Sequence, residues 1–279
     1  MTVAPQTALF SIRDLRLSFP DRDAKPLFGP APRVEVLKGL TLDFPEGKIT
    51  GIVGESGSGK SSLGRVLVRL LTPDSGAVIF DGQEIGALDE PALRPLRRDL
   101  QMIFQDPMSS LNPRHKVWQI IAQPLKRYGT NATRDTAIAA LKKVGLPEAF
   151  ADRYPHQLSG GQRQRVGIAR AIALRPRFIL ADEIVSGLDV SSQAQVLALL
   201  ASLARDMGLT LAFISHDLSV VRHLCDHVVV LHHGEIVDHG AVAEVFDNPS
   251  SEITRSLLAA IPRPEIDEGW WDDGVELES

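Results

Sequence analysis

Alternating apolar and polar residues predict strands in the N-terminal part of the chain. Residues 8–19 and 33–53 alternate in this way, and the proline- and glycine-containing stretch between them predicts a long loop. Residues 76–85 predict a hairpin that turns at Asp81 and Gly82. The chain therefore begins with strands that have one face toward a core.

From residue 62 onward, helical spacing alternates with short apolar runs. Wholly apolar runs of strand length are typical of a buried parallel sheet, and spacings of three and four residues are typical of helices with one buried face. The predicted strands are residues 100–104, 178–181 and 210–215. The predicted helices are residues 62–71 (Leu63, Val66, Leu67 and Leu70 on one face), most of 111–157 with Gly145 as the end of the last helix there, 161–174 with Ser159 as N-cap, a helix from Ser191 or Ser192 to Met207, and 218–224. This alternation indicates a mainly parallel α/β core.

Composition narrows the class of protein. Among 279 residues, 44% are hydrophobic and 23% are charged, which is ordinary for a soluble globular protein. The net charge of −5, without a basic cluster, gives no indication of a nucleic-acid partner. The single cysteine, Cys225, excludes an intrachain disulfide and a cysteine-only metal or iron–sulfur cluster, and we expect it to be a buried structural thiol.

The apolar runs also bear on membrane insertion. The longest of them, residues 209–214 and 228–231, are far shorter than the roughly 20 residues that cross a bilayer. Residues 1–5 lack the pattern of a secretory signal. We expect a cytosolic chain, and any membrane complex that contains it would need other chains to span the bilayer.

The most specific pattern is a phosphate-binding loop. Residues 54–61 match G-x-x-x-x-G-K-[ST] between a short apolar strand, residues 48–53, and a predicted helix. In this motif backbone amides cradle the phosphates, Lys60 reaches the β- and γ-phosphates, and Ser61 ligates Mg²⁺. The residues expected to contact ATP here are Gly54, Glu55, Ser56, Gly57, Ser58, Gly59, Lys60, Ser61 and Ser62.

Two carboxylates follow a buried strand further along the chain. Asp182 ends the apolar run at the point where a carboxylate would hold the Mg²⁺ of the phosphate loop through water. Glu183 comes next and suits a general base or a group that orients the attacking water. Three histidines, His232, His233 and His239, are expected at the surface of a hairpin rather than in a metal site.

A second motif, residues 158–162, reads LSGGQ, the signature of ATP-binding-cassette (ABC) ATPases. With the phosphate loop, it makes the chain resemble ABC-transporter ATPase subunits from about residue 9 to 262. The resemblance is closest to the oligopeptide and dipeptide importer branch, which also contains nickel importers. Branch-like segments are residues 101–107, 110–114, 154–157, 188–191 and 254–260.

This resemblance implies a fold and a set of residue roles. The fold is a P-loop NTPase (RecA-like) core, mainly parallel, with an N-terminal antiparallel part and an inserted helical subdomain. The ATPase domain is expected at residues 8–248, with the helical insert at about 106–160, and an extension with an acidic tail at 249–279. The resemblance implies that Phe19 stacks on adenine, that Gln105 contacts Mg²⁺, the γ-phosphate and the permease region, and that His216 contacts the γ-phosphate. It also implies that the ATP of the opposite subunit is bound by Ser159, Gly160, Gly161 and Gln162. Asp189 would form a link across the dimer.

The implied function is ATP hydrolysis that energises an importer of peptides or related solutes. The partners would be two transmembrane permeases, an extracytoplasmic solute-binding protein and a second ABC ATPase; a homologous chain is favoured, and an identical one stays open. The chain would sit peripherally on the cytoplasmic face of the inner membrane. The alternative is a non-transport ABC ATPase in DNA repair or on ribosomes, which typically carries coiled-coil, zinc or tandem-cassette additions that this sequence lacks.

The chain departs from the branch in three places. Ile184 stands where the family has proline, Gly187 where it commonly has alanine, and residues 251–254 where it often reads His-Pro-Tyr-Thr. None of these removes a catalytic group, so we expect hydrolysis to persist. The tail at residues 264–279 carries Trp270 and Trp271 among acidic residues; a solvated tail is favoured, and a partner-docking segment is the alternative.

Overall fold

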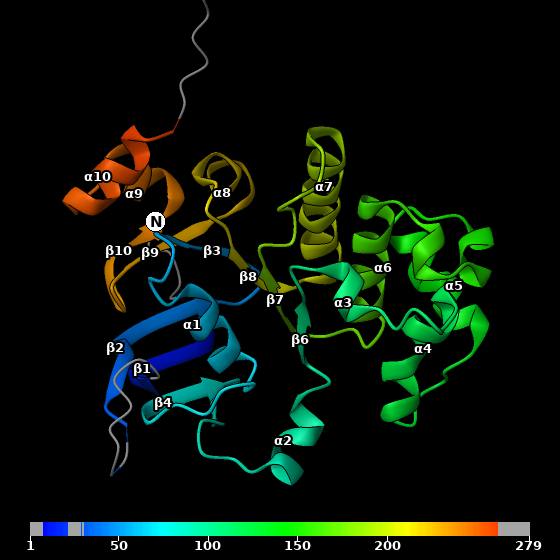
Figure 1. The fold of residues 1–279 in the computed structure, drawn as a ribbon, viewed down its shortest axis with the longest axis horizontal. Helices are drawn as coiled ribbons and strands as arrows, with labels where there is room; N and C mark the ends of the chain where they lie inside the picture. Colours follow the sequence, from blue (N-terminus) through cyan, green and yellow to red (C-terminus); the bar gives the residue numbers. More distant parts are fainter. Residues whose placement is uncertain (1–7, 22–28, 30, 262–279) are drawn as a thin grey trace, which may run out of the picture.

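The computed structural model describes residues 8–21, 29 and 31–261. Figure 1 shows two sheets and helices around them, with a separate helical group at one end. The strands are β1 (Ala8–Pro20), β2 (Arg33–Pro45), β3 (Ile49–Gly54), β4 (Ser75–Phe80), β5 (Gln83–Glu84), β6 (Leu100–Ile103), β7 (Phe178–Asp182), β8 (Thr210–Ile214), β9 (His227–His232) and β10 (Glu235–Ala241). The helices are α1 (Lys60–Leu67), α2 (Glu90–Leu96), α3 (Pro107–Ser110), α4 (Val117–Arg127), α5 (Arg134–Lys143), α6 (Gly160–Ile172), α7 (Val190–Met207), α8 (Leu218–Leu224), α9 (Val242–Asp247) and α10 (Glu252–Ala259), with 3₁₀ turns at Glu148–Asp152 and Pro155–Gln157.

The two sheets differ in direction. Within the described residues, β2-β1-β4-β5 form an antiparallel sheet, and β10-β9-β3-β8-β7-β6 form a sheet in which β9, β3, β8, β7 and β6 run parallel. Strands β3, β7 and β8 read as continuous apolar runs because helices and the other sheet cover both of their faces. The carboxyl ends of β3, β7 and β8 meet at one edge, so the residues that follow them come together. The predicted α/β fold is confirmed.

Helix α1 lies between the two sheets and joins their cores. Its residues Leu63, Val66 and Leu67 are fully buried in a cluster that includes side chains of both sheets. Gly64 permits this approach, because a Cβ there would lie 2.9 Å from side-chain atoms of β7 and β8. Phe10 and Phe178 pack against each other across the same interface, with ring centroids 4.7 Å apart and ring planes tilted by 52°. The helix that follows the phosphate loop is therefore held rigidly.

The chain between β6 and β7 forms the helical group. Helices α4, α5 and α6 pack on one another, and α6 also contacts β6 and α7. The apolar residues of these helices belong to the same buried cluster as one face of the central sheet. The helical group thus extends the core, and Figure 1 shows it at the opposite end of the molecule from α10.

Several local expectations need correction. Helix α1 ends at Leu67 and Arg69 takes a positive φ of 53°, so Leu70 leaves the helix face and is 52% exposed rather than buried. Helix α7 begins at Val190 with Asp189 as its N-cap, so neither Ser191 nor Ser192 opens it.

Two further segments refine the expectations about the chain ends and the histidines. Ser251 is the N-cap of α10, and Thr254 is buried, so the unusual residues 251–254 still begin a docked helix. His232 is half-buried, with Nδ1 3.7 Å from Glu55 Oε2, which corrects its expected surface position, whereas His233 and His239 are exposed as expected. The acidic tail after Ile261 lies outside the described residues.

The described residues contain neither a membrane-spanning helix nor a metal-binding cluster. No helix among the residues that the structure describes combines the length and the apolar content needed to cross a bilayer. The same residues contain no cluster of three or more histidine, cysteine or acidic side chains placed to hold a metal ion. The residue Cys225 is half-buried. Burial of its sulfur raises the pKa of the thiol, as expected for a structural cysteine.

Candidate nucleotide-binding site

The loop between β3 and α1, residues 54–62, is named here the P-loop face. Gly54 has a φ of 146°, and a Cβ there would lie 2.1 Å from the carbonyl oxygen of Leu231, so only glycine fits. Gly59 is the N-cap of α1 and has no side chain to cap the helix. The amides of the first turn of α1 thus face the loop, which makes its N-terminus a binding site for phosphate.

Lys60 is held over this loop by backbone carbonyl groups. Its Nζ donates hydrogen bonds to the carbonyl oxygens of Gly54 at 2.8 Å and Glu55 at 2.6 Å. The residue is only 7% exposed, and burial lowers the pKa of its ammonium group, an effect that Glu183 and other nearby carboxylates partly offset. A phosphate would supply the charge partner that this buried ammonium has only in part.

Asp182 and Ser61 form an oxygen-rich pair beside the loop. Ser61 Oγ donates a hydrogen bond to Asp182 Oδ1 at 3.2 Å, across the gap between α1 and the end of β7. Asp182 is 5% exposed, and burial raises its pKa because the ionised form loses solvation. A buried carboxylate beside a hydroxyl is a donor set that suits a hard cation such as Mg²⁺, whose charge would stabilise the ionised form.

Glu183 lies where three segments meet. Its Oε2 accepts a hydrogen bond from Gln105 Nε2 at 3.0 Å, and its Oε1 is 4.0 Å from Nδ1 of His216. The backbone has an uncommon φ of 48°, which turns the side chain away from the direction of Asp182 one residue earlier. Consecutive carboxylates therefore have separate tasks: Asp182 points to Ser61, and Glu183 points to Gln105 and His216.

One hollow of about 520 Å³ brings nine of the predicted residues together. It is lined by Phe19, Val36, Ser56, Gly57, Gly59, Lys60, Ser61, Ser62, Glu183 and His216. Phe19 is 37% exposed on β1, and its partner Val34 on the paired strand β2 is 50% exposed. A flat apolar rim next to a cationic phosphate loop is suited to a nucleotide base and its phosphates.

The LSGGQ segment lies elsewhere. Residues 159–162, named here the signature face, begin the 13-residue helix α6. The Ser159 side chain accepts a hydrogen bond from the amide of Gln162, and the Gln162 side chain accepts one from the amide of Ser159. Ser159, Gly161 and Gln162 line a separate hollow of about 250 Å³, apart from the P-loop pocket. Asp189 is also outside that pocket and caps α7 by accepting from the amide of Ser192.

Sequence reasoning missed two features of the site. Ser186 Oγ donates to the carbonyl oxygen of Glu183 at 2.7 Å and lies 3.5 Å from Gln105 Nε2, so it supports both residues. Its position three residues after Glu183, the spacing of a local turn, is the only signal for it in the sequence. A groove beside Gln105 was also missed, although Leu70 and Phe104 were apolar residues at the ends of predicted elements.

A phosphate loop, a buried aspartate on its serine and a neighbouring glutamate define the class of P-loop nucleotide-hydrolysing proteins. A family model described as ABC transporter matches residues 37–186. The oligopeptide transport ATP-binding protein OppF of Escherichia coli K12 is 45% identical over 264 residues, which cover 93% of this chain and 79% of that one. AppF of Bacillus subtilis 168, with the same description, is 45% identical over 94% of this chain and 80% of its own length. The chain belongs to the ABC transporter ATP-binding family.

Solved structures agree with this assignment. The dimeric ABC transporter cassette MJ0796 is 30% identical, with a TM-score of 0.73 over 84% of this chain and 98% of that one; it has also been solved in a post-hydrolysis state with ADP and phosphate. The cbiO1 protein of Clostridium perfringens, part of the ABC transporter complex cbiONQ, is 28% identical, with a TM-score of 0.75 over 92% of this chain and 96% of that one. The predicted family and its P-loop NTPase fold are confirmed.

Proposed function

We propose that this chain is the ATP-hydrolysing subunit of a membrane importer for peptides or related solutes. The observation that carries the proposal is the pocket in which Lys60, Ser61 and Glu183 meet, in a chain that is 45% identical to oligopeptide transport ATP-binding proteins. Relatives of that name match nearly the whole of this chain, which favours a role in solute import over a role in DNA repair or on ribosomes.

Each residue of the pocket has a task in hydrolysis. Lys60 and the amides of the P-loop face bind the β- and γ-phosphates, and Phe19 stacks on the adenine. Glu183 accepts a proton from the attacking water, and His216 binds the γ-phosphate on the other side. Ser61, Asp182 and Gln105 would hold Mg²⁺, which neutralises charge on the phosphates.

Gln105 links the pocket to its surroundings. Its amide nitrogen donates a hydrogen bond to Glu183 at 3.0 Å. Gln105 would hold Mg²⁺ through its amide oxygen, and an amide turned in that way would leave Glu183 free to orient water. Nucleotide binding and the position of the segment after β6 are thereby coupled.

The signature face supports a dimeric mechanism. It begins a long helix, its amides are an anion-binding group, and it lies outside the P-loop pocket of the same chain. A second cassette, facing the first, would bring its own Ser159, Gly160 and Gly161 onto the γ-phosphate. Val190, next to Asp189, is 85% exposed and would be covered in this pairing. The partner is a homologous or identical ATPase.

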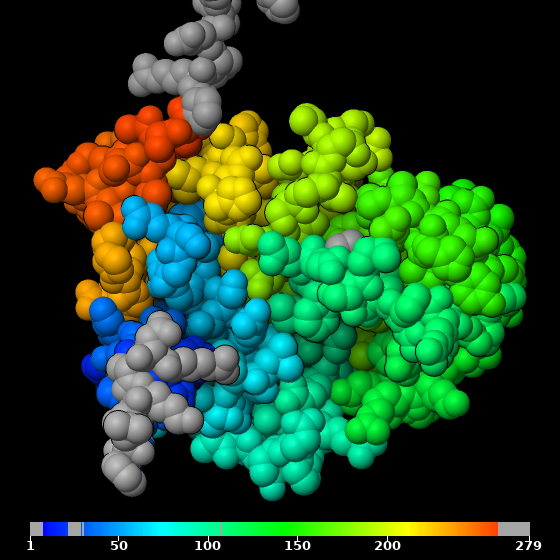
Figure 2. Space-filling model, in the orientation of Figure 1, coloured from blue at the N-terminus to red at the C-terminus, as the bar shows by residue number. Residues whose placement is uncertain are grey.

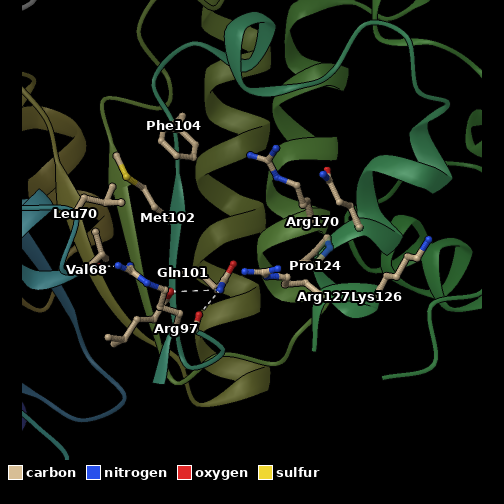
Figure 3. Close-up of a pocket in the computed structure, with 12 residues that line it drawn as sticks. Val68, Leu70, Arg97, Gln101, Met102, Phe104, Pro124, Lys126, Arg127 and Arg170 are labelled. Atoms are coloured by element: carbon tan, nitrogen blue, oxygen red, sulfur yellow. Dashed lines mark hydrogen bonds between the residues drawn. The ribbon is translucent and has the colours of Figure 1, made fainter. Parts of the chain in front are cut away.

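A groove of about 570 Å³ next to Gln105 suits a permease. Figure 3 shows it between β6 and α4, with Leu70, Met102 and Phe104 on one side and Arg127 and Arg170 on the other. Leu70 and Phe104 are 52% and 41% exposed, an unusual exposure for large apolar side chains. The occupant we propose is a short cytoplasmic helix of a permease with an apolar face and acidic ends.

The complex then has two permeases, two ATPases and an extracytoplasmic solute-binding protein, with this chain on the cytoplasmic face of the membrane. The described residues include six exposed large hydrophobic side chains, and the proposed complex gives each of them a partner. Phe19 and Val34 flank the base, Val190 faces the second cassette, and Leu70, Phe104 and Met108 lie at or beside the permease groove.

The test is to purify the tagged chain from gently solubilised native membranes and to identify its partners. Two multispanning permeases and a second LSGGQ-bearing subunit are expected. Arg127→Glu should remove the permeases, whereas Arg205→Glu, an equally exposed position on α7, should not. Recovery with ribosomal or DNA-repair proteins would replace the importer with the non-transport alternative. ATP hydrolysis by the isolated chain tests the enzymatic part separately.

A further inference from the structure

The negative net charge of the chain comes from its C-terminal segment, residues 262–279. It contains seven of the 35 acidic residues and one of the 30 basic ones, so it carries −6, and residues 1–261 carry +1 of the net charge of −5. Trp270 and Trp271 stand in the middle of it. Segments that remain in solvent are poor in large aromatic residues, so two adjacent indoles indicate a surface that receives them.

An apolar groove of about 350 Å³ runs between α7 and α8. Its lining includes Leu197, Ala198, Ala201, Val220, His223 and Leu224. Leu197, Val220 and Leu224 are only half-buried, with their inner sides on the main core. The side chains around the groove include no carboxylate, and Arg205 lies one turn beyond Ala201 on the same face of α7. This surface is apolar, free of negative charge and without a role in nucleotide binding.

Helix α10, which ends shortly before the acidic segment, lies along the same side of the molecule as α8 and α7 (Figure 1 and Figure 2). Ile261, the last described residue, packs against the same core as Leu197 and Leu224. Helix α9, which precedes α10, packs on α8, and Figure 1 shows α10, α9, α8 and α7 along one side of the molecule. Trp270 is nine positions after Ile261, and nine residues of extended chain span about 30 Å. The basic groove beside Gln105, which would also attract acidic residues, lies toward the other end of the molecule.

We propose that residues 262–279 dock on their own chain, with Trp270 and Trp271 in the groove between α7 and α8. The indoles cover the half-buried faces of Leu197, Val220 and Leu224, and the flanking carboxylates lie toward His223 and Arg205. Because the segment is tethered, its effective concentration at the groove is on the order of millimolar, so a weak contact suffices. The docked segment braces α8, which begins two residues after His216.

The experiment uses the tryptophan emission of the full chain. Trp118→Phe leaves only Trp270 and Trp271 as emitters. Compared with a synthetic peptide of residues 262–279, their emission is expected to be blue-shifted and quenched several-fold less by acrylamide. Ala198→Glu places a carboxylate in the groove and should return both values to those of the peptide. Ala139→Glu, the same change at an exposed helical position on α5, should alter neither.

Three results would overturn the proposal. Peptide-like values in the parent chain would show an undocked segment. Protection that survives Ala198→Glu would place the tryptophans on another surface. Protection that rises with protein concentration would place them on a second copy. If Trp118→Phe does not fold, 5-fluorotryptophan in the otherwise unaltered chain gives three fluorine resonances, of which two should move with Ala198→Glu. None of these readouts depends on ATP hydrolysis.

Discussion

The P-loop face and the signature face, which we propose both hold phosphate, differ in what supports them. The P-loop face is anchored in the middle of the core, and Lys60 already makes two hydrogen bonds there. The signature face lies at the start of α6, Ser159 and Gly160 are exposed, and the bonds of its side chains stay within its own first turn. The P-loop face is thus supported by contacts within this chain, whereas the signature face, in the proposed dimer, would act on a nucleotide held by the partner.

In the proposed mechanism, this difference explains how ATP would drive closure of the pair, as the following contacts show. A nucleotide on the P-loop face makes most of its contacts whether or not a second cassette is present. Contacts with the signature face exist only in the closed pair, so they favour that state by their full free energy. Hydrolysis removes the γ-phosphate that bridges the two faces, and the closed pair loses its advantage.

The largest expected effect is that of Glu183→Gln, which separates binding from chemistry. The amide keeps the hydrogen-bonding shape but cannot take a proton, so turnover should fall by about 10²-fold or more. ATP binding should be retained, and ATP-bound pairs should accumulate. Phosphate release and size-exclusion chromatography with ATP measure the two outcomes. Near-normal turnover in the purified variant would remove Glu183 from the role of general base.

A mixing experiment tests whether the two faces act in trans. Lys60→Ala disables the P-loop face, and Ser159→Phe blocks the signature face; each variant alone should lose about 10²-fold in turnover. In a mixed homodimer one site combines both defects and the other combines both intact faces. Equal mixing should therefore restore about a quarter of the parent sites.

The same mixture also reports on the identity of the partner. No recovery, with both variants folded and Ser159→Phe still able to bind ATP as a monomer, would indicate that the chain pairs only with a different ATPase. Full activity of Ser159→Phe alone would contradict the signature-face role. Nucleotide affinity of the separate variants, by titration calorimetry, is the control for the P-loop face.

Much of the P-loop face was predictable because its determinants are local. The spacing of Gly54, Gly59 and Lys60, between an apolar strand and an amphipathic helix, fixes a strand–loop–helix unit, and Asp182 and Glu183 follow an equally clear strand. Parallel topology then places these strand ends side by side. The capping box of Ser159 and Gln162 was also visible in the sequence as an N-cap.

What could not be predicted depends on contacts between distant segments. Leu70 fits the apolar period of α1, but the chain leaves the helix at Arg69, whose side chain bonds to carbonyl oxygens of Ile85 and Leu88. His232 was expected in solvent because nothing local places Glu55 beside it. The hydrogen bond from Gln105 to Glu183 joins residues 78 positions apart and has no trace in either segment alone.

A smaller effect is expected in stability, where Asp182 is compared with Asp81. Burial raises the pKa of Asp182, so the folded chain binds its proton more tightly than the unfolded chain does. The contribution of Asp182 to the free energy of unfolding therefore falls as pH rises from its pKa in the unfolded chain to its pKa in the folded chain. At pH 7 the ionised, buried carboxylate destabilises the fold. Asp182→Asn should increase the free energy of unfolding of the nucleotide-free chain at pH 7 by on the order of 1 kcal/mol, which raises its unfolding midpoint. The same substitution should abolish hydrolysis.

The pKa of Asp81 is shifted in the opposite direction to that of Asp182, so Asp81 serves as the control. A hydrogen bond from Arg177 lowers its pKa, so its stabilisation is present above the unfolded value and is lost as pH falls through the folded one. Asp81→Asn should lower the midpoint at pH 7 and leave hydrolysis intact, and both differences should shrink in acid. Equal behaviour of the two variants in thermal scans at pH 7 and pH 4 would contradict the assignment of Asp182 as a buried carboxylate awaiting a cation.

The smallest expected effect belongs to Gln162, which orders the signature face. Gln162→Ala leaves the amide of Ser159 without its acceptor, at a cost of about 1 kcal/mol in local helix stability, while ATP affinity of the monomer should not change. Gln162→Glu keeps an acceptor oxygen at the same place but adds a negative charge where the partner's γ-phosphate would bind. If the face serves phosphate, this variant should match the parent in hydrogen-exchange protection of the first turn of α6 and yet hydrolyse ATP more slowly than Gln162→Ala. Equal turnover of the two variants would mean that Gln162 only caps the helix and that the phosphate is held by Ser159 and the glycine amides alone.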